Sequence, residues 1–428
     1  MHAHRAAWRD QIRGYPGDKA FPAVDTSDGG AAVTNHPMDG AGHQLRLIRN
    51  ARKKSLTVIA QRAGISASYL SRLENGERAL DRRSLVVALA NALEVAPSEI
   101  TGAALAAPGS SEEDRSLNDV RLALLAVSMG EPAGDVVPVE GLRVRVTELL
   151  DDQKDCKSVD VGQALPGLIR DLHTTLSAGH DVATLLKLLA LTHVQGTQAW
   201  LMDVGANLDL AWQAAALAKG AAEQVDDRLT LAVSAFGTAF GLMGAGAFDL
   251  ASRAVSTADP GTATPEAMQA AGMLSLTSSL VAAARGDESE RSAALDHAAD
   301  LAAHTGEGNA LWFGFGPSNV GVWQMSVALE AGDYAEAARI ATTVHPEALP
   351  SPTRRSAYFR EYGRALAHLP RRTNEAVMML RRAEEISPTR IHRHPFMRSI
   401  LAELLTKAKR DSVGRELRGM AYRAGLHV

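Results

Sequence analysis

The chain has 428 residues, of which 46% are hydrophobic and 22% charged, which predicts two or more folded domains and excludes a disordered chain. No uncharged apolar run reaches the roughly 18 residues that a membrane span needs, and the first residues lack the apolar segment of a secretory signal. The single cysteine, Cys156, excludes an internal disulfide or a thiolate metal cage, so we expect a cytoplasmic protein without membrane contact.

Charge is distributed unevenly along the chain. Residues 43–100 carry ten Lys and Arg against five Asp and Glu, residues 101–351 carry 14 against 32, and residues 352–428 carry 17 against 7. A small basic block joined to a large acidic one predicts that only part of the protein meets a polyanion. For the basic C-terminal segment, solvated helix faces are the alternative interpretation.

Residues 1–42 are rich in Pro, Gly, Asp and Ser without periodicity, which predicts a disordered tail. The helical pattern begins at residue 43. There HQLRLIRNARKK places Leu45 and Ile48 on one face, with arginines around them, and this spacing predicts an amphipathic helix.

Two short helices joined by a glycine turn are predicted next. Ser55 caps SLTVIAQRAG, and Gly64 is expected to end that helix in the left-handed conformation. Ser66 caps the following helix, whose buried side is formed by Leu70 and Leu73. This arrangement is typical of a helix-turn-helix, to which RRSLVVALANALEV and APSEI add a fourth and a fifth helix.

The stretch SLTVIAQRAGISASYLSRLENGER resembles the helix-turn-helix of the phage-repressor family (Cro/CI-type, XRE), and the resemblance covers residues 43–103. It implies that Ser66–Glu74 is a recognition helix, which enters a major groove of double-stranded DNA. It also implies an internal ion pair between Arg49 and Glu74, which links the first and third helices and does not contact DNA.

Two positions depart from the family pattern. Leu56 stands where the family often has glutamine, so a contact made by that amide is expected to be absent. Lys53 and Lys54 stand where a glycine and a hydrophobic residue are usual, and we expect them to alter the turn and to add positive charge near the phosphates. Both departures leave the operator sequence unpredictable.

The outward side of the recognition helix carries the predicted contacts. Arg72 could make a bidentate contact to guanine, Ser68 could bond any base, and Ala67 could touch a thymine methyl group, while flanking polar groups bind phosphate. Ordinary exposed side chains are the alternative for each position. The predicted DNA-contacting residues are Ser55, Ser66, Ala67, Ser68, Tyr69, Ser71, Arg72, Asn75 and Arg78.

Residues 104–117 are predicted to be a linker, because the stretch APGSSEEDRS is rich in Pro, Gly, Ser and charge. Beyond it, a turn followed by an alanine-rich helix recurs about every 40 residues, which predicts stacked antiparallel helix pairs. The recurring segments are GANLDLAWQAA (205–215), GAFDLASRAV (246–255), RGDESERSAAL (285–295), AGDYAEAARIA (331–341) and RRTNEAVMML (371–380).

This region resembles a degenerate tetratricopeptide array. The stretches WLMDVGANLDLAWQAA, LWFGFGPSNVGVWQMSVALEAGDYAEA and HPFMRSILAELL also make it similar to the regulatory half of actinobacterial helix-turn-helix proteins, distantly like the peptide-sensing RRNPP regulators. The expected fold is all-α, with a five-helix N-terminal domain followed by an α-solenoid of helical hairpins over residues 118–428. That solenoid is expected to be the regulatory and dimerisation domain.

A peptide or small-molecule effector is predicted to bind the solenoid. In FGFGPSNVGVW, Asn319 lies at a helix start and Trp323 lies one turn later on the same face. An amide and an aromatic ring on a concave wall suit such a ligand, and Trp200 and Trp212 could line the same hollow. Filling of gaps between helix pairs is the alternative role for these residues.

The predicted function is sequence-specific regulation of transcription by a homodimer that binds an inverted-repeat operator, within the cytoplasm and associated with the nucleoid. A DNA-tethered scaffold, which uses its repeats to bind another protein, is the alternative. The histidines lack metal-ligand spacing, and GLMGAGAF lacks the strand and the third glycine of a dinucleotide loop. We therefore predict no enzyme activity, no cofactor and no metal.

Overall fold

The computed structural model describes residues 40–101, 112–349 and 351–426. All regular elements in these ranges are helical, and the ranges contain no strand, which confirms the predicted all-α class. The predicted disordered tail lies almost entirely outside the described residues, as does most of the predicted linker.

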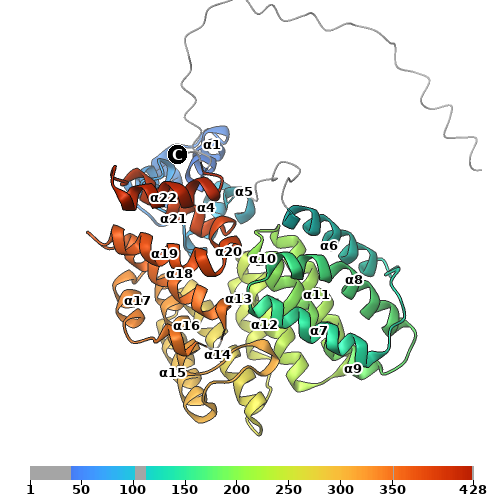
Figure 1. Cartoon of the computed structure of the whole chain (residues 1–428). Coiled ribbons are helices and arrows are strands. Elements are labelled where there is room, and N and C mark those ends of the chain that lie inside the picture. Colours follow the sequence, from blue (N-terminus) through green and yellow to red (C-terminus); the bar gives the residue numbers. More distant parts are fainter. Residues whose placement is uncertain (1–39, 102–111, 350, 427–428) are drawn as a thin grey trace, which may run out of the picture. The chain divides into compact units, whose positions relative to one another are not determined.

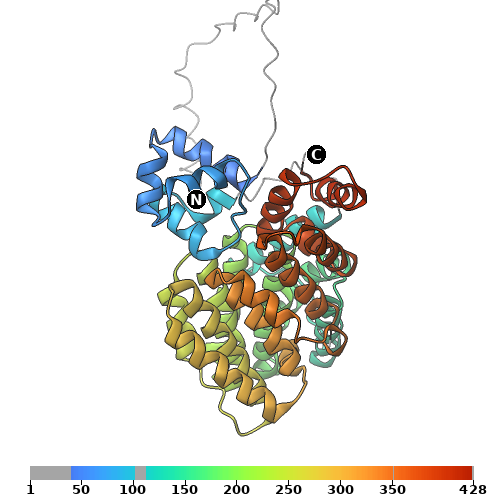
Figure 2. The ribbon, with the colours of Figure 1, turned by 90° about the vertical axis from the view of Figure 1, so that its left-hand side faces the viewer.

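The N-terminal domain contains the five predicted helices, coloured blue in Figure 2. Ser55 and Ser66 cap as expected, because their Oγ atoms accept hydrogen bonds from Val58 N at 3.3 Å and from Tyr69 N at 3.1 Å. Gly64, between them, adopts a φ of +68°. The helices are α1 (Ala41–Ala51), α2 (Leu56–Arg62), α3 (Ala67–Glu74), α4 (Arg83–Leu93) and α5 (Pro97–Thr101).

The first helix after this domain begins earlier than composition predicted. Helix α6 (Glu112–Ser128) includes the last residues of the predicted linker 104–117, so that prediction is wrong from Glu112 onward. Acidic residues suit a helix N-terminus because they interact favourably with the helix dipole. The run EEDRS, from Glu112 to Ser116, is therefore the start of a helix.

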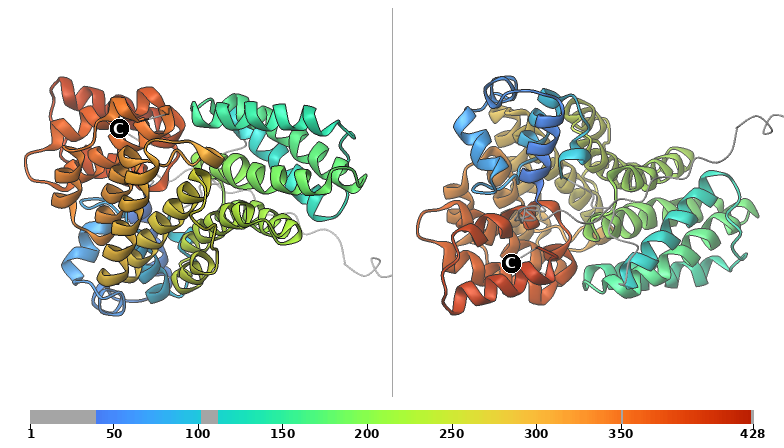
Figure 3. Two further views of the ribbon diagram at one scale, coloured as in Figure 1. Left: turned by 90° about the horizontal axis from the view of Figure 1, so that it is seen from below. Right: turned by 90° about the horizontal axis from the view of Figure 1, so that it is seen from above.

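A series of helices fills the remainder of the chain, and helices adjacent in sequence pack as hairpins (Figures 1 and 3). Examples are α14 with α15, α16 with α17, and α18 with α19. The helices are α7 (Val139–Lys154), α8 (Ser158–Ser177), α9 (Val182–Leu191), the π-helix η1 (Thr192–Gln198), α10 (Ala199–Asp203), α11 (Leu208–Val225), α12 (Arg228–Gly244), α13 (Phe248–Ser256), α14 (Pro265–Arg285), α15 (Glu288–Thr305), the 3₁₀-helix η2 (Ala310–Trp312), α16 (Pro317–Ala331), α17 (Tyr334–Ala341), the 3₁₀-helix η3 (Pro346–Ala348), α18 (Pro352–His368), α19 (Thr373–Ile386), α20 (Pro388–His392), α21 (Pro395–Thr406) and α22 (Ser412–Arg423).

The recurring sequence segments share one local geometry. Each has a residue with positive φ at its first or second position, and a helix starts within three residues of it. The turn residues are Gly205, Gly246, Gly286, Gly332 and Arg371. Glycine adopts this conformation at little cost, which explains the glycines at the recurring positions. The region after the N-terminal domain is thus repeat-like, with a tight turn before the second helix of each hairpin.

Helix α14 lies at the centre of the largest apolar core. By length and composition it could span a membrane, but 72% of its apolar window is buried inside the protein. Its Met273, Leu276 and Val281 have no exposed surface. Burial of this kind is typical of a core helix, whose apolar residues pack against the hairpins on either side.

Candidate nucleic-acid interface

The inward side of α3 is fixed by the core of the N-terminal domain. Leu70 and Leu73 are at most 1% exposed and pack in one cluster with Leu45, Ile59 and Leu89. Burying a leucine side chain contributes about 1.5–3 kcal/mol, so these contacts hold α3 against α1, α2 and α4. The orientation predicted from the leucine spacing is confirmed.

The ion pair that the family resemblance implied is also present. Arg49 Nε donates to Glu74 Oε1 at 2.6 Å, and Arg49 Nη2 donates to Glu74 Oε2 at 2.8 Å. The side chains are only 12% and 4% exposed, and the hydrogen bond to Glu74 raises the pKa of Arg49. This bidentate pair ties α1 to α3 inside the protein, as expected of a structural pair.

The outward side of α3 is polar and accessible. Among the predicted contact residues, Ser55, Ser66, Ser68, Arg72 and Asn75 are exposed, and Ala67, Tyr69, Ser71 and Arg78 are partly exposed. The exposed side chains lie along α3, at its two ends and at the capped start of α2. All of them therefore belong to the helix-turn-helix unit of the N-terminal domain. Their contact with DNA stays a prediction.

Arg72 lies back along its own helix, toward the end that is expected to face bases. Its Nε donates to the Ser68 carbonyl at 3.4 Å, and its guanidinium carbon is 5.9 Å from the centre of the Tyr69 ring. Both interactions are weak, and within the described ranges Arg72 makes no ion pair. Its terminal nitrogens can therefore pair with guanine without breaking a strong internal bond.

The segment that follows α3 is held by distant helices. Arg78 Nη1 lies 3.7 Å from Glu403 Oε1 on α21, so a phosphate at Arg78 would compete with this carboxylate. Ala79 N donates to Glu403 Oε2 at 2.8 Å, and Ser84 N donates to Glu330 Oε1 at 2.8 Å. The N-cap residue of α4, Arg82, makes no capping hydrogen bond with its side chain. The carboxylate of Glu330, on α16, therefore caps α4 instead.

A second set of contacts surrounds Asp81, which is 1% exposed. His368 Nε2 donates to its carboxylate at 3.0 Å, and Arg364 Nη2 donates to its carbonyl at 2.7 Å. Burial by itself would raise the pKa of Asp81. The hydrogen bond from His368 and the charges of Arg364 and Arg82 outweigh this effect, so the pKa of Asp81 lies below its ordinary value. The sequence offered no local signal for these contacts.

The turn before Ser55 contains a lysine in the left-handed backbone conformation. Lys53 adopts a φ of +52°, and Lys54 N donates to the Arg49 carbonyl at 3.2 Å. That the two lysines alter this turn relative to the family pattern stays a prediction. The backbone closes α1 through Lys53, which bears the cost of the left-handed conformation.

Replacing Lys53 by glycine should stabilise the N-terminal domain by about 1 kcal/mol, because the left-handed strain is removed while the unfolded chain gains some entropy. Hydrogen exchange of the α1 and α2 amides in the full chain measures the change. Lys54→Gly is the matched control, since it removes the same charge at a residue without positive φ and should destabilise the domain. Equal effects of the two variants would contradict the strain at Lys53.

The predicted effector residues occupy different environments. Trp200 is fully buried, with Nε1 donating to the Ser158 carbonyl at 2.8 Å. Asn319 is fully buried, and its amide nitrogen and oxygen have no hydrogen-bond partner among the described residues. Trp323 is 7% exposed and meets the Phe240 ring edge-on, with the ring centres 6.0 Å apart.

Trp212 is the accessible one of the four, with 40% of its surface exposed. Its ring covers Gly241, where an added Cβ would lie 2.8 Å from the ring. Trp212 therefore lies beside Gly241 and Trp323 beside Phe240, two neighbouring residues of α12. The fold brings these two tryptophans near one place, while their role in effector binding stays a prediction.

The comparisons with known proteins concern the N-terminal domain. Residues 41–101 match the family model described as "Helix-turn-helix domain". Over 58 residues the chain is 38% identical to the HTH-type transcriptional repressor RghR of Bacillus subtilis (strain 168), which is 14% of this chain and 43% of that repressor. No solved structure matches the chain. Residues 41–101, with α2 and α3 joined through Gly64, form a helix-turn-helix domain.

Proposed function

We propose that the chain is a sequence-specific DNA-binding regulator of transcription, in which α3 enters a major groove. The observation that carries this proposal is the division of α3 into two sides. Its leucines are locked in the core, while Ser68 and Arg72 are exposed on a basic domain. The similarity to a protein named as a transcriptional repressor supports the same function.

We further propose that residues 118–428 form the tetratricopeptide-like regulatory and dimerisation domain of an actinobacterial XRE-type regulator. A homodimer would place its two copies of α3 in successive major grooves about 34 Å apart, on an inverted-repeat operator. The acidic surplus of residues 101–351 supports this arrangement, because it repels DNA and leaves the basic domain to face the duplex. The proposed site of action is the nucleoid in the cytoplasm, and the proposed activity is binding without catalysis.

The test of the proposal is selection of binding sites from randomised duplexes with the purified full chain, followed by footprinting. A sharp inverted repeat with two protected half-sites is expected. Diffuse occupancy without a consensus would instead support a scaffold that the N-terminal domain merely tethers to DNA.

Replacing Arg72 by alanine should weaken binding to the selected operator by about 1–3 kcal/mol and relax the preference at one base position. Fluorescence anisotropy with the operator and with single-base variants measures both effects. Arg253→Ala, an equal change of charge at an exposed position of α13, is the control and should leave affinity unchanged. Unchanged affinity of the Arg72 variant would show that this side of α3 does not read the groove.

A further inference from the structure

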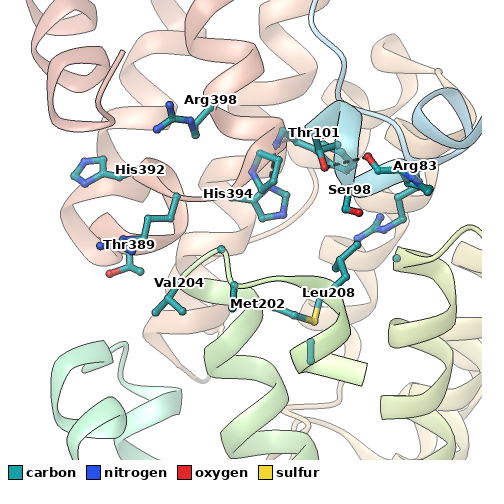
Figure 4. Close-up of a pocket in the computed structure, with 18 of the residues that line it drawn as sticks. Arg83, Ser98, Thr101, Met202, Val204, Leu208, Thr389, His392, His394 and Arg398 are labelled. Carbon is teal, nitrogen blue, oxygen red and sulfur yellow. Dashed lines mark hydrogen bonds between the residues drawn. The ribbon is translucent and has the colours of Figure 1, made fainter. Parts of the chain in front are cut away.

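A cavity of about 520 Å³ lies where three separate parts of the chain meet. Figure 4 shows Arg83 and Ser98 of the helix-turn-helix domain on one side, and His392, His394 and Arg398 of the C-terminal helices on another. Residues of α10 to α12 and of the loop before α11 close the third side. Its volume falls within the range of about 300–1,000 Å³ that small-molecule sites occupy.

Much of the cavity wall is apolar. Val86 of α4, Leu208 of α11, Phe240 of α12 and Phe396 of α21 all line it. A wall of this kind favours an apolar ligand body, because binding removes the apolar surface of both partners from water. Trp323, which was predicted to bind an effector, meets Phe240 edge-on and so supports this wall without lining it.

Several charged side chains of the wall are paired with carboxylates of the protein. Arg423 Nε and Nη2 donate to the two carboxylate oxygens of Glu384 at 2.8 Å each, and His392 Nε2 lies 2.6 Å from Glu384 Oε1. Arg83 Nη1 lies 3.6 Å from Glu330 Oε2. The charges of these lining residues are therefore compensated without any ligand.

The remaining charged groups of the wall do not need a ligand either. Arg398 Nη1 donates to the carbonyl of Ala424, and both Arg393 and Arg398 have further partners in the protein. Glu113, the carboxylate among the described lining residues, is partly exposed, so water can solvate it. A charged ligand would thus leave water without gaining a free counter-charge, which is strongly unfavourable. The wall favours an uncharged ligand.

His394 supplies this wall with a neutral hydrogen-bond donor. Its Nδ1 accepts a hydrogen bond from Phe396 N at 3.2 Å. Burial, together with the charges of Arg360, Arg364 and Arg83, lowers the pKa of His394 well below its ordinary value. The ring is therefore neutral at pH 7 and carries its proton on Nε2, which can donate to an uncharged ligand oxygen.

The three sides of the cavity touch one another at close contacts. At Gly246, in the turn after α12, an added Cβ would lie 2.7 Å from Val87 of α4. At Gly205, an added Cβ would lie 2.8 Å from the Arg393 carbonyl. A molecule in the cavity would therefore contact the helix-turn-helix domain, α10 to α12 and the C-terminal helices at once.

We infer that this cavity binds a neutral, largely apolar organic molecule. Its body lies along Leu208, Phe240 and Phe396, and its one polar oxygen accepts a hydrogen bond from His394 Nε2. In the proposed regulator, on which this part of the inference rests, the molecule is the effector. Because it contacts α4 together with the helical repeats, its binding changes how firmly the helix-turn-helix domain is held.

The test uses the full chain and three probes with the same ten-carbon chain, namely 2-decanone, decanoate and decylammonium, each below the concentration at which it aggregates. Isothermal titration should show saturable binding of 2-decanone. Both charged probes should bind at least about tenfold more weakly, which is about 1.4 kcal/mol, because neither meets an unpaired counter-charge. A charged probe that binds as tightly as the ketone, or no saturable binding of 2-decanone up to its solubility, would overturn the inference.

A variant that fills the cavity locates the site. Ala206→Phe adds a ring at a half-buried lining position and should abolish binding of 2-decanone, while circular dichroism and the melting temperature show that the variant is folded. Ala216→Phe, at an exposed position of α11 that does not line the cavity, is the matched control and should bind as the wild type does. Unchanged binding in a folded Ala206→Phe protein would place the site elsewhere.

Replacing His394 by asparagine tests the hydrogen bond to the ligand. Asparagine can still accept from the backbone N–H of Phe396, because it is a favourable N-cap residue, but it has no N–H group where Nε2 lies. The variant should bind 2-decanone about fivefold more weakly, a change typical of one neutral hydrogen bond. Unchanged affinity in the folded variant would contradict the role of His394.

Operator binding separates this inference from the proposed function. Bound 2-decanone should change operator affinity at least about threefold in the wild type, which is about 0.65 kcal/mol of coupling, and should leave it unchanged in Ala206→Phe. If the chain binds no duplex, the proposed function fails, although titration still decides the cavity. If operator binding is sharp but insensitive to bound 2-decanone, the effector role fails while the DNA-binding function stands.

Discussion

Replacing Glu74 by alanine is expected to destabilise the helix-turn-helix domain by about 3 kcal/mol, because it leaves the guanidinium of Arg49 without its carboxylate in a nearly buried place. The two side chains are 12% and 4% exposed and share two short hydrogen bonds. Water can replace little of that interaction. The outward side of α3 would lose its fixed position, and operator binding should fall with it.

Hydrogen exchange of the α1 and α3 amides in the full chain measures this effect, since it reports local opening. About 3 kcal/mol corresponds to exchange more than 100-fold faster. Glu77→Ala is the control, because it removes an equal charge from an exposed position three residues away and should leave exchange unchanged. The double variant Arg49→Met, Glu74→Leu should recover most of the protection, since replacing both partners by apolar groups removes the stranded charge.

The helix-turn-helix could be predicted because its signals are local. Two serine caps, one glycine and two leucines three positions apart define α2, the turn and α3 within a short stretch. The recurring turns of the repeats were also visible, because each needs a residue that tolerates positive φ. The start of α6 was missed because Glu, Asp and Ser occur both in linkers and in the first turn of a helix.

The contacts around the segment 78–84 could not be predicted in this way. Glu403 and Ser399 accept hydrogen bonds from backbone groups more than 300 positions earlier in the chain, and nothing near them indicates the partner. The cavity is hidden for the same reason, since its sides come from three segments far apart in sequence. Asn319 and Trp200 were chosen for their residue types, and sequence could not reveal that both are completely buried.

Glu361, on α18, is a buried carboxylate that two arginines of the same helix, Arg360 and Arg364, bind. It is 2% exposed, and Arg360 Nε and Nη2 donate to its Oε1 at 3.0 and 2.7 Å. Arg364 Nη1 donates to its Oε2, and the same guanidinium binds the Asp81 carbonyl of the helix-turn-helix domain. Loss of charge at Glu361 would therefore leave buried arginines uncompensated and weaken the hold on residues 78–84.

Burial raises the pKa of Glu361, but the charges of Arg364 and Arg360 dominate and lower it to about 2, from an ordinary value of 4.5. A carboxyl group whose pKa is lower in the folded state stabilises the fold above its unfolded pKa, and this contribution is lost as pH falls. The contribution of Glu361 should therefore be complete above about pH 5 and absent below about pH 2. Its size is about 3 kcal/mol, at about 1.4 kcal/mol per pKa unit.

Glu361→Gln should accordingly be less stable than the wild type by at least about 3 kcal/mol at pH 7, with the difference shrinking as pH falls toward 2. Urea unfolding followed by circular dichroism at several pH values measures the two curves. The difference between them isolates Glu361, because Asp81 and Glu384 also have lowered pKa values and contribute to both curves. Glu385→Gln, an exposed position on α19, is the control and should track the wild type throughout. A pH-independent difference for Glu361→Gln would mean that shape, and not charge, makes this residue important to the core.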